Sequence, residues 1–252
     1  MISIMFLKLR KLLAVVFWLI VWELFSLSIH EEILLPSPVA VFTTLFGLLQ
    51  TLDFWQTIVY SSLRILLGCI LAVVTGTVFA AAAHRLLWIR ELLVLPIKIM
   101  ETIPVACFII IALLWLHPRN LSILVAYMMV LPMIYSSVLQ GLRSTDEKLL
   151  QMAFVFRLTV WKKVKAIYIP AVKPFFLNAV SVGIGFGWKA GIATEVIANS
   201  NQSIGERLYE ARLYVMTKEL LAWAVVIILI SIFYEKAAML ILRLLHQERR
   251  PV

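Results

Sequence analysis

Six long stretches of mostly apolar residues dominate this chain and limit what it can fold into. They cover residues 12–29, 61–83, 92–116, 121–140, 174–198 and 219–243. A helix of about 20 apolar residues crosses the hydrocarbon layer of a bilayer, which is roughly 30 Å thick. We therefore predict an all-α membrane protein with six transmembrane helices.

The small share of charged residues supports a membrane location. Of the 252 residues, 63% are hydrophobic and 15% are charged, and the mean hydropathy is +0.99. Soluble domains carry charged side chains at about 25% of their positions, so a soluble all-helical protein is disfavoured. The net charge of +9 comes from basic residues between the apolar stretches. This distribution indicates topology signals and anionic lipid headgroups as partners, and no nucleic acid.

The first apolar stretch imitates a secretory signal peptide, because Lys8, Arg10 and Lys11 precede it. It is longer than the apolar region of a signal peptide, and no small-x-small cleavage site follows it. We expect an uncleaved span. The segment 36–60, which Asp53 and two prolines interrupt, is expected to be interfacial or extracytoplasmic and to contain a short helix.

The distribution of Lys and Arg predicts the orientation. With the N-terminus in the cytoplasm, six spans place fifteen of the 23 Lys and Arg residues in cytoplasmic segments. The opposite side then carries only four, which are Arg119, Arg207, Arg212 and Lys218. Basic residues favour the cytoplasmic side. We therefore expect both termini in the cytoplasm.

The connection over residues 142–173 contains a predicted amphipathic helix. Apolar side chains recur at helical spacing over residues 146–165. Asp146 and Glu147 at its start and lysines at its end suit the helix dipole. Pro170 is expected to end this helix. Without further signals, such a helix would be expected to lie on the inner leaflet.

The spacing in this connection resembles the cytoplasmic EAA loop of ABC-importer permeases. Gln151-Met152-Ala153 is followed after three residues by Arg157, and after nine more by Ile167-x-Ile169-Pro170. The family pattern has Glu-Ala-Ala, Gly and Ile-x-Leu-Pro at these places, so four positions differ. Arg157 replaces the glycine of a sharp turn, which leaves a turn and a continuous helix as alternatives.

Further motifs resemble the nitrate/sulfonate/taurine branch of these permeases, and they occur in the family's order. They are Leu34-Leu35-Pro36-Ser37-Pro38, Ser61-Ser62-Leu63-Arg64, Glu101-Thr102-Ile103-Pro104, Pro170-Ala171-Val172-Lys173-Pro174, Trp188-Lys189 with Glu195, Ile204-Gly205 with Ala211, and Ala222-Trp223. The resemblance extends over residues 34–245. It implies a type I permease fold that forms a single domain over residues 1–252.

The resemblance implies partners and a mechanism. Two ABC ATPase subunits would bind ATP and Mg²⁺ on the cytoplasmic side of a bacterial or archaeal plasma (inner) membrane. A second permease copy or a homologue, and an extracytoplasmic substrate-binding protein, would complete the system. The coupling loop would insert a short helix into the ATPase. The residues implied for this contact are Leu149, Leu150, Gln151, Met152, Ala153, Phe154, Arg157, Leu158, Trp161, Ile167 and Pro170. The chain has no G-x-x-x-x-G-K-[ST] motif, so no cofactor is expected in it.

Ionisable residues inside predicted spans are candidates for the translocation pathway, because a buried charge in a membrane is costly. They are Arg64, Lys98, Glu101, Lys189 and Glu195. Lys98 and Glu101 can form an i,i+3 ion pair or act at a gate. Lys189 either attracts an anion in the pathway or pairs with Glu195, Glu101 or Glu23.

Three glycines at four-residue spacing, Gly183, Gly187 and Gly191, predict close helix packing. This packing can lie within the subunit or across a dimer, and the competing interpretation is a hinge. Three proline residues inside predicted spans are expected to kink or interrupt them. They are Pro96, Pro104 and Pro132.

The branch resemblance implies import of a small anionic or zwitterionic solute such as nitrate, a sulfonate, taurine or bicarbonate. Permeases for riboflavin or a thiamine precursor are the alternative, followed by an ion-coupled carrier that uses Glu23, Glu101 or Glu195. An intramembrane enzyme is disfavoured because the histidines lie apart and neither HExxH nor GxSxG occurs. No catalytic or metal-binding residue is expected.

Overall fold

Every regular element in the described part of the chain is a helix, as predicted. The computed structural model describes the backbone of residues 2–247 and the side chains of residue 10 and residues 13–241. The elements are α1 (Ile2–Ile29), α2 (Pro38–Leu49), α3 (Leu52–Arg85), α4 (Leu87–Thr102), α5 (Val105–Ala112), α6 (Pro118–Arg143), α7 (Glu147–Val155), α8 (Val160–Lys163), the π-helical turn η1 (Val164–Tyr168), α9 (Ile169–Ala198), α10 (Ile204–Leu213) and α11 (Thr217–Gln247). The basic side chains of Lys8, Lys11, Arg243, Arg249 and Arg250, which the predicted orientation uses, lie outside this description.

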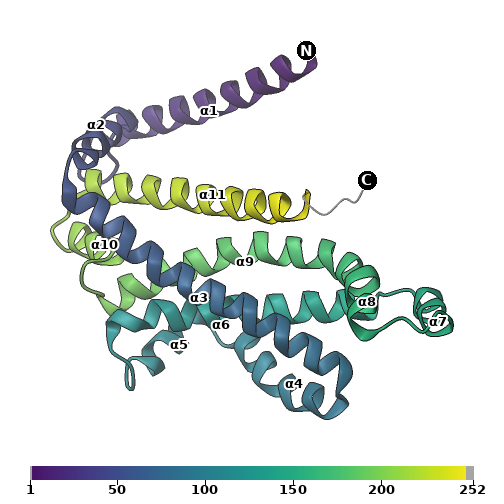
Figure 1. Cartoon of the computed structure of the whole chain (residues 1–252). Coiled ribbons are helices and arrows are strands. Elements are labelled where there is room, and N and C mark those ends of the chain that lie inside the picture. The colour runs from purple at the N-terminus through teal and green to yellow at the C-terminus, as the bar shows by residue number, and fades with distance from the viewer. Residues whose placement is uncertain (1, 248–252) are drawn as a thin grey trace.

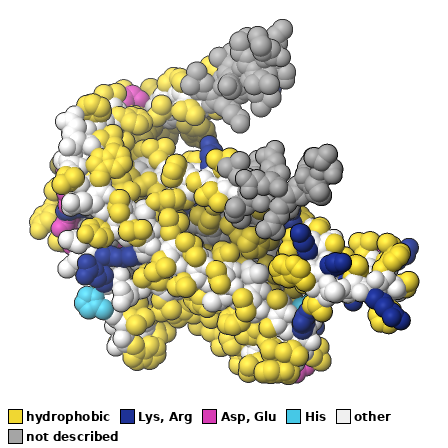
Figure 2. All heavy atoms as spheres, in the orientation of Figure 1, with side chains coloured by type: hydrophobic (Ala, Val, Ile, Leu, Met, Phe, Trp, Pro, Cys, Tyr) yellow, Lys and Arg dark blue, Asp and Glu magenta, His cyan; other side chains and the backbone are white. Residues whose placement is uncertain are grey.

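Three long helices, α3, α6 and α9, form the centre of the molecule, and α6 packs along both of the others. Helix α11 packs against α9, α2 and α10, and α4 and α5 lie against α6 (Figure 1). More than half of the most apolar 18-residue window of α6 is buried, 56%, against 6% for that of α11. The bundle therefore has a dry centre and an apolar outer surface, which Figure 2 shows over most of the visible face.

Four helices are long and apolar enough to cross a membrane in the described part of the chain: α3, α6, the continuous run from α8 through α9, and α11. Helices α4 and α5 together make a fifth candidate, although they are bent by 105°. The described apolar part of α1, Leu13–Ile29, is shorter. The structure thus supports four or five spans, and a sixth over residues 12–29 stays a prediction.

The bend between α4 and α5 occurs at Pro104. The preceding residue, Ile103, is extended, with φ −71° and ψ 127°. Proline disfavours the helical conformation of the residue before it, so the helix ends there. The interruption predicted at Pro104 is confirmed, whereas Pro96 and Pro132 lie inside α4 and α6.

The prediction of one helix over residues 146–165 is wrong. Helix α7 ends at Val155, the chain turns, and α8 begins at Val160. The prediction that Pro170 ends a helix is also wrong, because the chain stays helical through η1 into α9. In this turn the Ile169 amide bonds back to the Val164 carbonyl. Pro170 is the second residue of α9 and lies inside this continuous helical run.

Two ends of the bundle can be distinguished. The α7 end is where α7 and α8 project, and the first turn of α1 and the last turn of α11 point to the same side (Figure 1). The α10 end carries α2, α10 and the start of α6. The central helices α3, α6 and α9 connect these two ends.

Candidate functional site

Helix α7 is a short projection whose two ends are fixed by local hydrogen bonds. Asp146 caps its start, because its carboxylate accepts the Lys148 amide at 2.8 Å. At the other end the Leu158 amide bonds to the Ala153 carbonyl at 2.9 Å, and the Arg157 amide bonds to that of Phe154 at 3.0 Å. This pair of bonds is a Schellman motif, which ends a helix in a left-handed residue.

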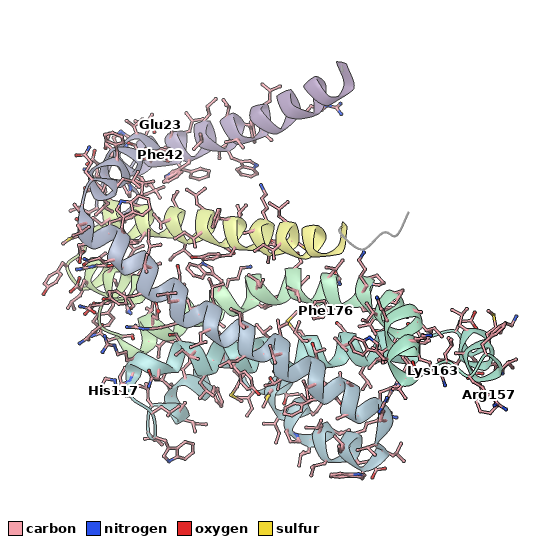
Figure 3. All side chains as sticks on the ribbon, viewed as in Figure 1. Glu23, Phe42, His117, Arg157, Lys163 and Phe176 are labelled. Atoms are coloured by element: carbon pink, nitrogen blue, oxygen red, sulfur yellow. The ribbon has the colours of Figure 1, made fainter. Side chains whose placement is uncertain are left out.

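The left-handed residue is Arg157, with φ 47°. A side chain in this conformation costs about 1–2 kcal/mol, which is why glycine usually occupies it. The sharp turn left open by the sequence is therefore present, and it forms despite the arginine. In Figure 3 the Arg157 side chain lies at the tip of the projection, away from the bundle.

Large apolar side chains of the projection face outward. Phe154 is 78% exposed, and Val155, Phe156 and Trp161 are exposed to a similar degree. Lysine and arginine side chains lie among these apolar groups at the α7 end (Figure 2). An apolar surface with a basic rim on a projecting helix suits a protein groove as its partner.

The residues predicted for coupling fall into two groups in the structure, one buried or half-buried and one exposed. Ala153 is 1% exposed and Ile167 is also buried, while Leu150 and Leu158 are half-buried. The outward-facing members are Leu149, Gln151, Met152, Phe154, Arg157, Trp161 and Pro170. The single apolar face expected over residues 146–165 does not exist, because the turn at Arg157 folds the segment back.

Lys98 and Glu101 lie 3.7 Å apart on the last turns of α4. Both side chains are exposed, so the pair contributes little to stability. Glu101 also lines a cavity of about 530 Å³ at the break between α4 and α5. Pro132 and Ser136 of α6 form its opposite wall.

Lys189 is exposed on the surface of the subunit near the middle of α9. Its ammonium lies 5.9 Å from the centroid of the Phe186 ring. The ion pairs between described residues do not include it. Val182, Phe186 and Ala193 are exposed on the same face of the helix. An ammonium at this depth requires water or protein beside it rather than lipid.

The Glu195 carboxylate is fully buried where α3, α9 and α10 meet. Ser61 Oγ donates to Glu195 Oε2 at 2.7 Å and accepts the Ile204 amide at 2.9 Å. The Gly205 amide donates to the same carboxylate oxygen at 3.4 Å. The Ser61 hydroxyl thus joins α3 to both of the other helices. Glu195 holds the α10 end together and does not face an open pathway in this conformation.

Arg64 lies one turn further along α3 and is half-buried. Its guanidinium donates to Ser200 Oγ at 3.3 Å. In the described part of the chain, Arg64 Nη2 and Glu195 Oε1 are buried without hydrogen-bond partners. The two groups form no ion pair with each other there. One guanidinium nitrogen and one carboxylate oxygen at the α10 end therefore remain without a partner in the described chain.

The glycines of α9 face the other central helices of the same chain. A Cβ atom on Gly191 would lie 2.5 Å from Ile65 Cγ1, and one on Gly187 would lie 2.6 Å from Cys69 Sγ. Gly183 lies against Val130 of α6. The approaches at Gly187 and Gly191 are too close for a side chain, and the one at Gly183, 3.2 Å, is tight, so the small residues serve packing within the subunit.

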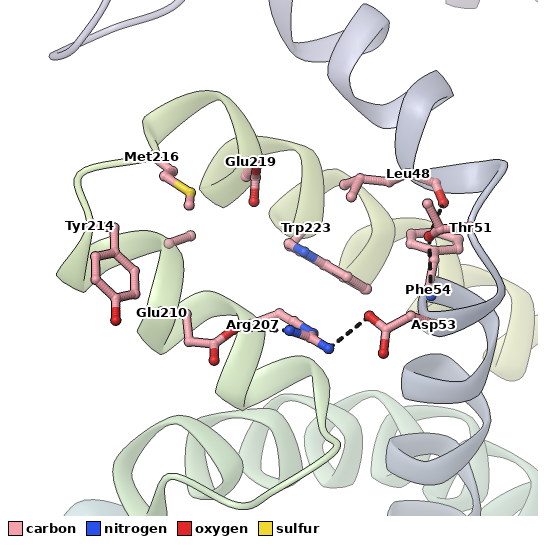
Figure 4. A pocket seen from close by; sticks show the side chains of 11 residues that line it. Leu48, Thr51, Asp53, Phe54, Arg207, Glu210, Tyr214, Met216, Glu219 and Trp223 are labelled. Atoms are coloured by element: carbon pink, nitrogen blue, oxygen red, sulfur yellow. Dashed lines mark hydrogen bonds and ion pairs between the residues drawn. The ribbon is translucent and has the colours of Figure 1, made fainter.

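A cavity of about 270 Å³ opens at the α10 end (Figure 4). Arg207 pairs there with Asp53 at 2.7 Å and with Glu210 at 3.0 Å. Burial opposes the charge on Arg207, but the two carboxylates outweigh it and raise its pKa above the ordinary value. The rings of Phe54 and Trp223 line the same cavity, with centroids 5.0 Å apart.

Residues 64–251 match the family described as "Binding-protein-dependent transport system inner membrane component". The chain belongs to this family. It is an ABC-importer permease of the nitrate/sulfonate/taurine branch, as the sequence motifs predicted.

Three relatives illustrate the similarity. The taurine transport system permease protein TauC of Escherichia coli is 24% identical over 220 residues, which cover 85% of this chain and 80% of its own. The putative aliphatic sulfonates transport permease protein SsuC of the same organism is 25% identical over 226 residues, covering 89% and 86%. The bicarbonate transport system permease protein CmpB of Synechococcus elongatus is 25% identical over 207 residues, covering 77% and 73%.

Sequence reasoning missed several polar contacts of this permease. The Ser61–Glu195 bond joins residues 134 positions apart, and no local pattern signals it. Asp53 stood out only as an interruption of an apolar segment, and its partner Arg207 only as one of few basic residues on its side. The available signal for this pair was that Asp53 and Arg207 carry opposite charges and were expected on the same side of the membrane.

Proposed function

We propose that this permease forms the translocation pathway of an ABC importer for a small anionic or zwitterionic solute. It has six spans with both termini in the cytoplasm, and separate ATPase subunits drive it through the α7 projection. The observation that carries this proposal is the exposed apolar surface of α7 and α8, at the place where the family pattern has its coupling loop.

The arrangement of the helices supports this topology. Helix α3 ends at the α7 end and α6 begins at the α10 end, so the bent α4–α5 pair connects the two sides. Helix α1 contacts α2 and begins at the same side as α7 (Figure 1). Counting both as crossings gives six spans. The α7 end is then cytoplasmic, because its loops carry the larger share of Lys and Arg.

The coupling role follows from what the projection can do mechanically. Its turn is fixed by the Schellman motif, and α8 continues through η1 into α9 without a flexible linker. A partner that binds Phe154 and Trp161 would therefore move α9 as a rigid body. Such a partner would be an ATPase subunit, and two of them would act on two permease copies.

The names of the relatives support the substrate class. They refer to taurine, aliphatic sulfonates and bicarbonate, which are all small and carry an anionic group. The exposed ammonium of Lys189 at mid-span supplies a complementary charge. An extracytoplasmic binding protein would deliver the solute to the α10 end.

The coupling surface is tested by charge substitution. Phe154→Glu and Trp161→Glu should each weaken co-purification of the ATPase subunit about 30-fold, the usual effect of losing an interfacial aromatic anchor worth ~2 kcal/mol. Trp115→Glu is the matched control, because this tryptophan is equally exposed at the opposite end. Solute-stimulated ATP hydrolysis should fall in parallel with co-purification.

Full ATPase binding by the Phe154→Glu, Trp161→Glu double variant would disprove the coupling surface. Solute uptake by the purified chain in vesicles without any ATPase would disprove the importer assignment and favour an ion-coupled carrier. Co-reconstitution with the ATPase subunits separates the two outcomes.

A further inference from the structure

Two adjoining cavities lie at the α7 end, outside the polar sites described above. Together they are lined by α3, α6, α8, η1 and α9. The first has a volume of about 610 Å³ and the second about 360 Å³. Ala81, Leu142, Val164 and Tyr168 line both of them, so the two form one continuous groove.

The second cavity is an apolar slot. Its walls are formed by Val138 and Leu142 of α6 and by Val172, Phe176 and Leu177 of α9. All of the α9 residues are only partly buried, so their apolar surface remains open to the outside. This open surface is not filled by any other element of the described chain.

The first cavity is a basic mouth. His84 and Arg85 line it from the last turn of α3, and Lys163 lines it from α8. Arg85 and Lys163 are the cations of the mouth, and Lys173 adds a third at the slot. Neither cavity has an Asp or Glu among its lining residues, and the ion pairs between described residues include none of these cations. The mouth therefore presents uncompensated positive charge.

The two cavities follow the polarity of the membrane. Along α3, Arg85 lies at the helix end and Thr77, which lines the slot, lies eight residues deeper, about 12 Å along the axis. In Figure 3, Lys163 lies where α8 leaves the bundle and Phe176 lies further along α9, toward its interior. Charge thus sits at headgroup level and apolar surface at acyl-chain level.

We propose that this groove binds an anionic phospholipid, with its phosphate in the basic mouth and an acyl chain in the apolar slot. Basic pockets between transmembrane helices bind acidic headgroups in this way. A soluble anion would use the mouth but leave the slot exposed, and a neutral lipid would use the slot but leave the cations unpaired. Only a ligand with both parts matches both cavities.

The position of the groove links the lipid to the coupling projection. Lys163, Val164 and Tyr168 belong to α8 and η1, the segment that joins the projection to α9. A bound lipid would hold this segment against α3, where the Tyr168 ring already contacts His84 with centroids 5.7 Å apart. This inference does not depend on which solute the permease carries.

Native mass spectrometry of the purified permease tests the site. The protein would be incubated with phosphatidylglycerol and phosphatidylcholine of equal chain length. We expect phosphatidylglycerol to be retained preferentially. The Arg85→Gln, Lys163→Gln double variant should bind it about 25-fold more weakly, since each basic side chain near a headgroup contributes about fivefold. The control is Arg90→Gln, Lys165→Gln, which removes the same charge at the same end outside the groove.

The slot is tested separately by filling it. Ala81→Phe places a ring where the two cavities meet, and it should abolish retention of phosphatidylglycerol. Val78→Phe is the control, because Val78 is exposed on the same helix but lines neither cavity. Gel filtration confirms that each variant is folded.

Four outcomes would overturn the proposal. They are equal retention of the two lipids, wild-type binding by the Arg85→Gln, Lys163→Gln variant, equal loss in its control, and wild-type binding by Ala81→Phe. Displacement of the lipid by inorganic phosphate alone would show that only the headgroup is recognised. It would therefore also overturn the assignment of the slot as the acyl-chain site.

Discussion

At the α10 end, charged and polar side chains find partners within the chain, whereas at the α7 end large apolar side chains point away from it. Arg207 pairs with two carboxylates, Lys218 pairs with Glu32 at 2.5 Å, and Ser61 donates to one oxygen of the Glu195 carboxylate. Phe154 and its apolar neighbours on the projection have no such partners in the described chain.

This difference separates the residues that stabilise the subunit from the residues that remain exposed for contact with other proteins. The α10 end joins α3, α9, α10 and α11 by contacts that each need a specific residue. The projection owes its shape to backbone hydrogen bonds and the Asp146 cap, so its large apolar side chains are not needed to hold it and stay exposed. Substitutions at the first end should therefore change stability, and those at the second should change association.

The largest effect is expected from a side chain at Gly191. Gly191→Leu forces α9 away from Ile65 and should lower the free energy of unfolding by about 3 kcal/mol, the upper range for overpacking. Gly185→Leu is the control, because a Cβ there meets nothing within 4 Å. Unfolding in a detergent titration measures both. Equal losses in the two variants would contradict the packing assigned to Gly191.

The hydroxyl of Ser61 comes next. Ser61→Ala removes its bonds to Glu195 and to the Ile204 amide, and should cost about 2 kcal/mol for two hydrogen bonds of ~1 kcal/mol each. Ser62→Ala is the control, because this neighbouring hydroxyl is buried without a partner in the described chain. Its effect should stay within ~0.5 kcal/mol. If both alanines cost the same, Ser61 would not join the helices as described.

A smaller effect of opposite sign is expected at the tip of the projection. Arg157→Gly relieves the left-handed conformation and should stabilise the turn by about 1 kcal/mol. Hydrogen exchange of the Leu158 amide should slow about fivefold, with no change in unfolding of the bundle. Gln151→Gly within α7 is the control and should speed exchange, because glycine weakens a helix interior. Unchanged or faster exchange in Arg157→Gly would contradict the assigned strain.

The exposed ion pair of Asp53 and Arg207 should give the smallest effect. A double-mutant cycle with Asp53→Asn and Arg207→Gln should show a coupling of about 0.5 kcal/mol that falls as salt is added. The Lys98–Glu101 pair is the reference, because it is longer and its cation is more exposed than Arg207. A coupling that salt leaves unchanged would mean that the Asp53–Arg207 pair is buried in the membrane-bound protein.

Much of the helical layout could be predicted from apolar stretches, because each stretch must satisfy its own backbone in lipid. Helices α6, α9 and α11 cover the predicted stretches 121–140, 174–198 and 219–243. The start of α3 was predicted nine residues too late, since Asp53 reads as an interruption. In the structure Asp53 serves the first turn of that helix, where a negative charge suits the dipole.

The candidate site was harder to predict, because its shape depends on single residues that break local rules. Arg157 occupies a glycine conformation, and Pro170 sits inside a continuous helical run. Both contradict residue preference, and each is tolerated because neighbouring backbone bonds are satisfied. The family spacing around Arg157 indicated a turn as one alternative. The helical periodicity over residues 146–165 instead predicted a continuous helix, which was wrong.

The π-helical turn η1 sets the rotational phase of everything that follows it in α9. A π turn holds one more residue than an α turn, and each residue of an α-helix advances the face by about 100°. Without that extra residue, Gly187 and Gly191 would rotate away from α3 and α6, and the ammonium of Lys189 would swing toward the dry centre. One extra residue near the start of α9 thus determines which face of this 30-residue helix packs against the core.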